Sequence, residues 1–303
     1  MAGGEGPRLS QCGREITDSD VEHLKAVVAG FPRLSRKELA LTLCEHWGWV
    51  AGTGAHKVTA CMRLLEKLEK AGVVRLPEKQ AQSGGKRWRS PELTEGTREQ
   101  RVISGDLCEL GRVRLDLTGS RAETELCNEY IERYHYLKYK KPFGCVLRYM
   151  AVSEKGLVGC VLMAGAAKSI RARDTWIGWS ERQRLRNLPW VIGNSRFLIL
   201  PWIQVKHLAS HVLGQLARQV AEDWEGRWGY RPVLMETFVD PALYGGTCYR
   251  AAGWICLGYT SGRGLTRPGR RYKSTRKIIY VRPLVRDFRQ QLCWEELKGR
   301  VIE

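Results

Sequence analysis

Apolar residues recur at helical spacing in three stretches near the start of the chain. The first stretch, after Thr17, and the second, after Ser35, each begin with a capping-box spacing, in which an acidic residue follows the capping residue by three positions. The third runs from about Lys57 to Ala71, where Gly72 provides a stop. We therefore predict three consecutive helices.

The residues after the third helix complete the pattern of a winged helix-turn-helix. Val73–Leu76 is predicted as a short strand, and a polar segment after it leads to the basic Arg87–Arg89. In such domains the third helix enters the major groove of DNA and the wing contacts phosphates. The alternative is a small helical adaptor that binds protein. The predicted DNA-contacting residues are Lys57, Thr59, Arg63, Lys67, Lys86 and Arg87.

From about Val113 the pattern changes to alternating strands and amphipathic helices. The predicted order is strand, helix, a two-stranded hairpin, strand, a long helix over Leu208–Trp224, strand, short helix and two final strands. This order is typical of an α/β domain with a mixed sheet. The predicted division is a disordered tail (1–15), a winged-helix domain (16–90), a linker (91–111), the α/β domain (112–284) and a C-terminal helix or tail (285–303).

The charge balance indicates a polyanionic partner, because the 303 residues carry a formal net charge of +18 and nucleic acid is the commonest such partner. The segment Gly262–Arg282 holds eight basic residues and no acidic one, and its glycines predict a flexible loop. Tyr259 and Tyr272 could stack on unpaired bases. The alternative is a solvated basic loop. The expected phosphate contacts here are Arg263, Arg267, Arg270, Arg271, Lys273, Arg276 and Lys277.

Other classes of protein fit the sequence less well. Residues 1–15 have no apolar stretch typical of a signal peptide, and the longest apolar runs, Cys160–Ala167 and Phe197–Ile203, are too short to span a bilayer. We therefore expect a cytoplasmic protein with no membrane partner. The ten cysteines form no CxxC pair, so we expect reduced thiols and no metal site.

Two features of the α/β domain resemble the GCN5-related N-acetyltransferase (GNAT) fold. Pro201 closes a predicted central strand shortly before the long helix, and Tyr249 precedes Gly253 and Trp254 with the spacing of a signature of that superfamily. The resemblance implies that Glu236 accepts a proton from an incoming amine and that Tyr249 protonates a leaving thiolate.

The same resemblance implies an acyl-CoA site at the start of the long helix. Its backbone N–H groups, at Lys206, His207, Leu208 and Ala209, would hold a pyrophosphate. One departure from the superfamily's loop counts against this site. His207 stands where the superfamily has its middle glycine, and a side chain there can obstruct the cofactor.

A second resemblance covers nearly the whole chain. Six strings resemble the DruA family, which includes a component of the Druantia anti-phage system and also occurs with transposases. This resemblance implies a role in prokaryotic anti-phage defence or in a mobile element, with other defence or transposase proteins as possible partners. The strings are Arg133–Leu137 (RYHYL), Trp176–Trp179 (WIGW), Asn194–Pro201 (NSRFLILP), Leu208–His211 (LASH), Glu236–Asp240 (ETFVD) and Gly246–Ala252 (GTCYRAA).

We therefore predict an α/β protein in which a winged helix holds duplex DNA and a GNAT-like domain grips nucleic acid with its basic loop. One alternative is an acyl-CoA-dependent N-acyltransferase recruited to nucleic acid. The other is a metal-dependent nuclease or recombination factor built on Glu236 and Asp240, which are four positions apart. If the chain is an enzyme, acyl transfer is preferred over nuclease chemistry, since no third acidic ligand is evident and a divalent cation is not expected.

Overall fold

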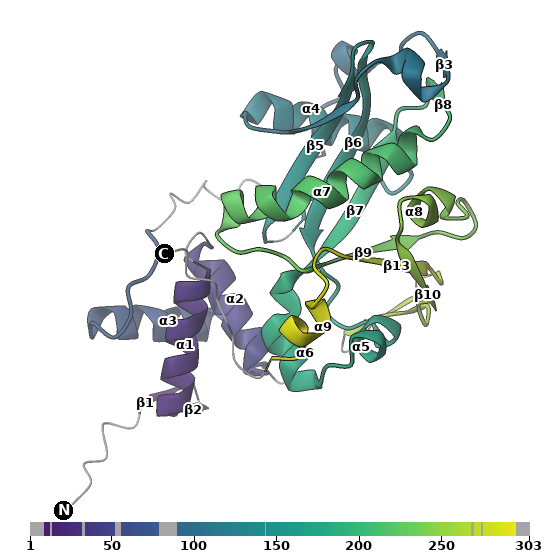
Figure 1. The fold of residues 1–303 in the computed structure, drawn as a ribbon. Coiled ribbons are helices and arrows are strands. Elements are labelled where there is room, and N and C mark those ends of the chain that lie inside the picture. The colour runs from purple at the N-terminus through teal and green to yellow at the C-terminus, as the bar shows by residue number, and fades with distance from the viewer. Residues whose placement is uncertain are drawn as a thin grey trace, which may run out of the picture.

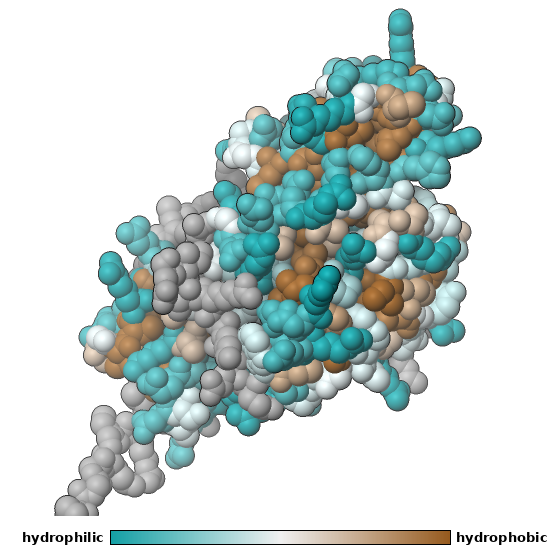
Figure 2. Space-filling view, viewed as in Figure 1, coloured by the Kyte–Doolittle hydropathy of each residue, from teal (hydrophilic) through white to brown (hydrophobic). Residues whose placement is uncertain are grey.

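The computed structural model describes residues 9–12, 14–31, 34–51, 56–78, 90–142, 144–267, 270–273 and 275–294, with the backbone alone for 263–267 and 270–273. Figure 1 shows a helical part near the N-terminus, in purple, beside a larger part built on a sheet. In Figure 2, apolar areas gather on the larger part between hydrophilic ones. Among the described helices, none is long and apolar enough to cross a membrane.

The N-terminal part contains the three predicted helices, α1 (Asp18–Gly30), α2 (Arg36–His46) and α3 (Val58–Lys70). Both predicted capping boxes are confirmed, because the Thr17 and Ser35 side chains accept hydrogen bonds from backbone N–H groups three positions later. The helices bury one apolar face each. Their fully buried side chains are Leu24, Val27, Leu39, Ala40, Leu43, Cys44, Cys61, Leu64 and Leu65.

Two predictions for this part are wrong. The sequence predicts a disordered tail over 1–15, which is wrong for the residues of the antiparallel hairpin that β1 (Leu9–Gln11) forms with β2 (Arg14–Ile16). Residues 1–8 lie outside the described chain. No strand forms at Val73–Leu76, although Leu76 is buried against the helices. The apolar residues of 73–76 therefore pack against the helices without forming a strand. The predicted wing, with Lys86 and Arg87, lies outside the described residues.

The predicted linker also has structure of its own. Its elements are the short helices η1 (Glu95–Thr97) and η2 (Leu107–Leu110) and the strand β3 (Ile103–Gly105), which pairs in parallel with β8 (Ile203–Val205). The Thr97 hydroxyl, fully buried, donates to the Glu129 carboxylate at 2.5 Å. The polar composition of this segment therefore reflects side chains that bind the α/β part.

The larger part is built on a seven-stranded sheet with the order β10-β13-β9-β7-β6-β5-β4. All neighbours are antiparallel except β7 and β9. The strands of this sheet follow one another along the chain in the predicted order, whereas β8 is an additional strand that was not predicted. The strands are β4 (Arg114–Leu117), β5 (Val146–Ser153), β6 (Gly156–Gly165), β7 (Val191–Ile199), β9 (Leu234–Val239), β10 (Ile255–Tyr259) and β13 (Ile278–Pro283).

Helices cover both faces of this sheet. Successive side chains of a strand point to opposite faces. On β5, Tyr149 donates its hydroxyl to Asp223 of α7 (Leu208–Trp228), whereas Arg148 donates to Asn128 of α4 (Arg121–Tyr134). The helices α4 and α7 therefore lie on opposite faces. The remaining helices are α5 (Arg171–Ile177), α6 (Glu181–Asn187), η3 (Leu188–Trp190), α8 (Thr247–Ala251) and α9 (Phe288–Leu292), the last lying within the predicted C-terminal helix.

The two parts share an apolar contact. Phe31, fully buried at the end of α1, packs against Trp190 and Tyr230 with ring centroids 5.5 and 4.9 Å apart. The Lys168 ammonium lies 2.8 Å from the Glu45 carboxylate across the same boundary. The helical part is therefore packed against the sheet part.

Candidate functional site

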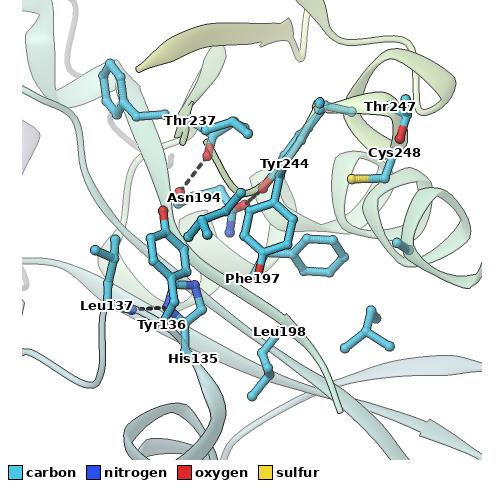
Figure 3. Close-up of a pocket in the computed structure, with 18 of the residues that line it drawn as sticks. His135, Tyr136, Leu137, Asn194, Phe197, Leu198, Thr237, Tyr244, Thr247 and Cys248 are labelled. Carbon is cyan, nitrogen blue, oxygen red and sulfur yellow. Dashed lines mark hydrogen bonds between the residues drawn. The ribbon is translucent and has the colours of Figure 1, made fainter. Parts of the chain in front are cut away.

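A cavity forms where two parallel strands of the sheet separate. The strands β7 and β9 pair only over their first three residues, from Val191 and Leu234 respectively. Beyond that point a cavity of about 420 Å³ lies between them (Figure 3). A bulge contributes to its shape, because Met163 pairs with Asn194 and Leu162 with Arg196, leaving Ser195 as an extra residue. Bulges of this kind redirect side chains next to functional sites.

A hydrogen-bonded group of side chains forms the polar part of the cavity. The Tyr249 hydroxyl donates to Asn194 Oδ1 at 2.8 Å, and the Thr237 hydroxyl donates to the Asn194 carbonyl oxygen at 2.9 Å. Burial raises the pKa of Tyr249 well above its usual value, so the phenol keeps its proton at neutral pH. Tyr249 is therefore a fixed hydrogen-bond donor in a largely apolar cavity.

His135 lies at the same cavity with a defined tautomer. Its Nδ1 accepts a hydrogen bond from the Leu137 N–H at 3.1 Å (Figure 3). Burial lowers the pKa of His135 to about 4, so the ring is neutral at pH 7. In that neutral form the proton is on Nε2, because Nδ1 is an acceptor.

The start of α7 borders the cavity through Ala209. His207, just before the helix, has a φ of 63°, in the left-handed region that glycine adopts most easily. A glycine would hold this backbone conformation with less strain than His207 does. The Lys206 N–H is already bound to the Gly105 carbonyl oxygen, at 3.4 Å. Of the four predicted pyrophosphate-binding residues, only Ala209 lines the cavity.

Glu236 does not line the cavity. It is fully buried, and its carboxylate lies 2.7 Å from the Arg173 guanidinium and 2.6 Å from the Ala167 N–H. Burial raises the pKa of Glu236, and Arg173 works against that rise. This placement gives Glu236 a structural partner and does not support the predicted role as a proton acceptor.

The carboxylates of the nuclease alternative are also engaged. Asp240 forms an ion pair with Lys277, which lowers the pKa of the Asp240 carboxyl. Glu236 is paired with Arg173. In the part of the chain that the structure describes, no group of three or more His, Cys, Asp or Glu side chains is arranged to hold a metal ion.

The basic segment forms a hairpin, contrary to the predicted flexible loop. Strands β11 (Arg263–Arg267) and β12 (Arg270–Lys273) pair in antiparallel fashion, with residues 268–269 and 274 outside the described chain. Beside it lies a groove of about 810 Å³. The Arg276 guanidinium is 5.3 Å from the centre of the Tyr259 ring, which is 52% exposed. Arg276 and Lys277 thus line a groove next to the five basic residues of the hairpin.

The predicted DNA-contacting face of α3 is partly occupied by the N-terminal hairpin. Lys67 Nζ donates to Gln11 Oε1 at 2.7 Å, and Lys57 Nζ donates to the Cys12 carbonyl oxygen at 3.3 Å. Thr59 and Arg63 are exposed. The structure therefore leaves the middle of this helix face open and ties its two lysines to the chain's own backbone and side chains.

Several residues that the structure brings together at the cavity were not predicted from the sequence. His135 and Tyr136 come from the loop after α4, Asn194 from β7, and Tyr244 from the loop after β9. Their signal was present, because the cavity is lined by residues of five of the six strings on which the DruA resemblance rests. Strings far apart in sequence that meet at one cavity indicate a functional site.

Several solved acetyltransferase structures match a little over half of this chain. The aminoglycoside acetyltransferase AAC(6')-Ib with coenzyme A and kanamycin is 18% identical, matches 57% of this chain and 95% of its own, and gives a TM-score of 0.36. A Bacillus subtilis acetyltransferase with CoA is 9% identical over 57% of this chain and 100% of its own, with a TM-score of 0.33. An agmatine N-acetyltransferase mutant is 12% identical, with the same coverages and a TM-score of 0.35.

No curated protein matches the chain. The family model that matches is the one described as Druantia protein DruA, and it covers residues 67–267. The match includes most of the seven-stranded sheet and all the residues that line the central cavity. This chain belongs to the DruA family.

Proposed function

We propose that this DruA-family chain is a nucleic-acid-binding component of an anti-phage defence or mobile-element system. The observation that carries the proposal is the groove beside the basic hairpin, where Arg276 stacks over the exposed ring of Tyr259. Stacked Arg and Tyr side chains are a common platform for unpaired bases, and the cations neutralise phosphates.

The charge of the groove supports this proposal. Arg171, Arg276 and Lys277 line it, and the described lining includes no carboxylate, although Asp240 pairs with Lys277 from outside the lining. Serine and threonine hydroxyls, such as Ser169 and Thr260, add hydrogen-bonding groups of the kind that contact phosphate oxygens. Trp176 provides a second aromatic surface, and the Arg289 guanidinium lies 4.4 Å from its ring centre.

The helical part is proposed to hold duplex DNA as a winged helix. Thr59 and Arg63 would contact the major groove directly, and Lys86 and Arg87 would contact phosphates from the wing. Lys57 and Lys67 would join them once released from the N-terminal hairpin, whose hydrogen bonds to them are exposed or partly exposed.

Fluorescence anisotropy of labelled single-stranded and duplex DNA across a salt series tests the proposal. Tyr259→Ala should weaken single-strand binding roughly tenfold, since base stacking on an aromatic side chain contributes about 1–3 kcal/mol. Arg121→Ala is a matched control, because Arg121 is 90% exposed on α4, away from the groove. Binding that ignores salt, or that falls equally in the Arg121 variant, would contradict the proposal.

A second candidate function is acyl-CoA-dependent N-acyl transfer in the central cavity. The observation that favours it is the protonated Tyr249 hydroxyl in a cavity bordered by the first turn of α7. Backbone N–H groups at Leu208 and Ala209 would bind the pyrophosphate of acyl-CoA, which would supply the activated acyl group. Tyr249 would donate its proton to the departing thiolate.

This candidate assigns no carboxylate base, because Glu236 is paired with Arg173 and the described residues lining the cavity include no Asp or Glu. Acetyl-CoA should raise the unfolding temperature if it binds. Ala209→Arg should abolish that rise by blocking the cavity, whereas Tyr249→Phe should keep the rise and lose acyl transfer. No thermal shift with acetyl-CoA would refute this second candidate and leave the first untouched.

A further inference from the structure

The mouth of the central cavity carries exposed apolar and aromatic side chains that neither function above uses. Tyr136 and Leu137 follow α4, and Leu243 and Tyr244 follow β9; all four line the cavity. They are 36, 47, 54 and 55% exposed, respectively. Large apolar side chains gathered at the entrance of a cavity mark a binding surface more often than single exposed ones do.

The aromatic rings at the mouth are arranged as the beginning of a stack. The rings of His135 and Tyr136 are stacked, with centroids 4.8 Å apart and an interplanar angle of 24°. Tyr244 approaches Tyr136 from the other loop at 5.7 Å and 58° (Figure 3). Because the Tyr244 side chain is half exposed, it can turn to admit a further flat ring against Tyr136.

Beneath these rings the described lining of the cavity offers one fixed hydrogen-bond donor, because Tyr249 already donates its proton to Asn194, and it carries no charge. Neutral His135 carries its proton on Nε2, since Nδ1 accepts from the Leu137 N–H. Among the described lining residues there is no carboxylate and no ammonium or guanidinium group. A neutral, flat ligand with acceptor atoms on its edge fits this chemistry better than an ion does.

The cavity and the basic groove lie next to each other across β9. Phe238 lines both, and Asp240, directly after β9, pairs with Lys277 of the groove. Arg196 helps burial to lower the pKa of His135, whereas burial and the Asp240 carboxylate raise the pKa of Tyr136 against Arg196. Cations of the groove thus lie beside a neutral aromatic mouth, which suits a flat ring attached to a phosphate chain.

We propose that the mouth of the cavity binds one unpaired nucleobase, stacked between Tyr136 and Tyr244, with His135 supporting the far face of the Tyr136 ring. This inference rests on the proposed nucleic-acid binding. The phosphates on either side of that base would then lie toward the groove lined by Arg276 and Lys277.

A single-stranded oligonucleotide that carries one 2-aminopurine tests this inference, because stacking on an aromatic ring quenches the fluorescence of that base. The full chain should quench the probe, and Tyr136→Ala or Tyr244→Ala should weaken binding of the probe base roughly tenfold. Tyr136→Phe and Tyr244→Phe should retain the quench, because they keep the ring and remove only the hydroxyl. Anisotropy of the same oligonucleotide reports overall binding separately.

The outcomes separate the two proposals. Anisotropy binding without quenching, or quenching that survives both alanine variants, would overturn the base site and leave the proposed function standing. If the oligonucleotide does not bind at all, the proposed function fails. Binding of the free 2-aminopurine nucleoside then tests the base site. Saturable quenching of the nucleoside that the alanine variants lose supports the site, and its absence overturns it. Saturable binding of pantetheine in place of the nucleoside would also overturn it.

Discussion

Replacing Arg173 by methionine should destabilise the fold strongly, because it leaves the buried Glu236 carboxylate without its cation. Both side chains are completely buried, and the guanidinium lies 2.7 Å from the carboxylate. The variant would keep only one described hydrogen bond to Glu236, from the Ala167 N–H at 2.6 Å. Methionine keeps an unbranched apolar stem like that of arginine and lacks the guanidinium, so the loss is mainly one of charge pairing and hydrogen bonds.

The magnitude follows from what remains unpaired. Removing one partner of a buried ion pair costs about 3–5 kcal/mol of unfolding free energy, because the other charge stays buried without compensation. Arg173 also donates to the Ala167 carbonyl oxygen at 2.7 Å and to Asp174 at 2.8 Å, which places the expected loss in the upper half of that range. Glu236→Gln should cost less, about 1.5–3 kcal/mol, since Arg173 keeps these other partners.

The loss should depend on pH in a defined direction. Burial already raises the pKa of Glu236, and removal of Arg173 removes the influence that lowers it. When the pKa of a carboxyl is higher in the folded than in the unfolded protein, the folded protein loses stability as the pH rises through the folded-state pKa. The penalty of Arg173→Met should therefore be smaller at about pH 5 than at about pH 8, because protonation relieves the buried charge.

Urea unfolding followed by tryptophan fluorescence at the two pH values measures this penalty. Arg171→Met is the matched control, because Arg171 is exposed on the same helix, and its effect should stay within about 0.5 kcal/mol. A loss below about 1 kcal/mol for Arg173→Met, or a loss that does not change with pH, would refute the reasoning.

Three further predictions concern stability, and each is checked by the same denaturation measurement. His207→Gly should raise the unfolding free energy by up to about 1 kcal/mol, because glycine adopts the left-handed conformation without steric cost; a decrease would contradict this. Phe31→Ala should lower the unfolding free energy by about 3–5 kcal/mol, because it removes the ring that packs between the helical part and the sheet part. A decrease below about 1 kcal/mol would contradict this. Gly159→Ala should destabilise, since its Cβ would come within 2.5 Å of the Leu198 carbonyl oxygen, and unchanged stability would show that β6 and β7 can separate.

Sequence patterns correctly predict those helices and turns whose stabilising contacts join residues close together in the chain. The capping boxes at Thr17 and Ser35 act over three positions, and both form as the spacing predicts. The long helix also begins at its predicted start, Leu208. The hairpin of β5 and β6 turns at Glu154 and Lys155, as the pattern indicates. These features are readable because their stabilising contacts are close in sequence.

The missed features depend on partners far along the chain. Strand β3 has only three residues and forms because β8 supplies its hydrogen bonds, so its own residues carry little signal. The place of Glu236 on a strand suggests a chemical role, yet its partner Arg173 lies 63 positions away. The basic segment has three glycines, which predict a loop, but β11 and β12 pair with each other across that segment. Composition does not reveal such pairings.

The salt dependence of DNA binding tests the central proposal most directly. Removing one phosphate-binding cation should reduce the slope of log affinity against log salt by about 1. Arg171 and Arg276 both line the groove, so Arg171→Ala with Arg276→Ala should reduce the slope by about 2. The wild-type chain should bind single-stranded DNA with a steep slope, and the double variant should bind more weakly with a shallower one. An identical slope in the two proteins, or a wild-type affinity indifferent to salt, would contradict the proposed nucleic-acid groove.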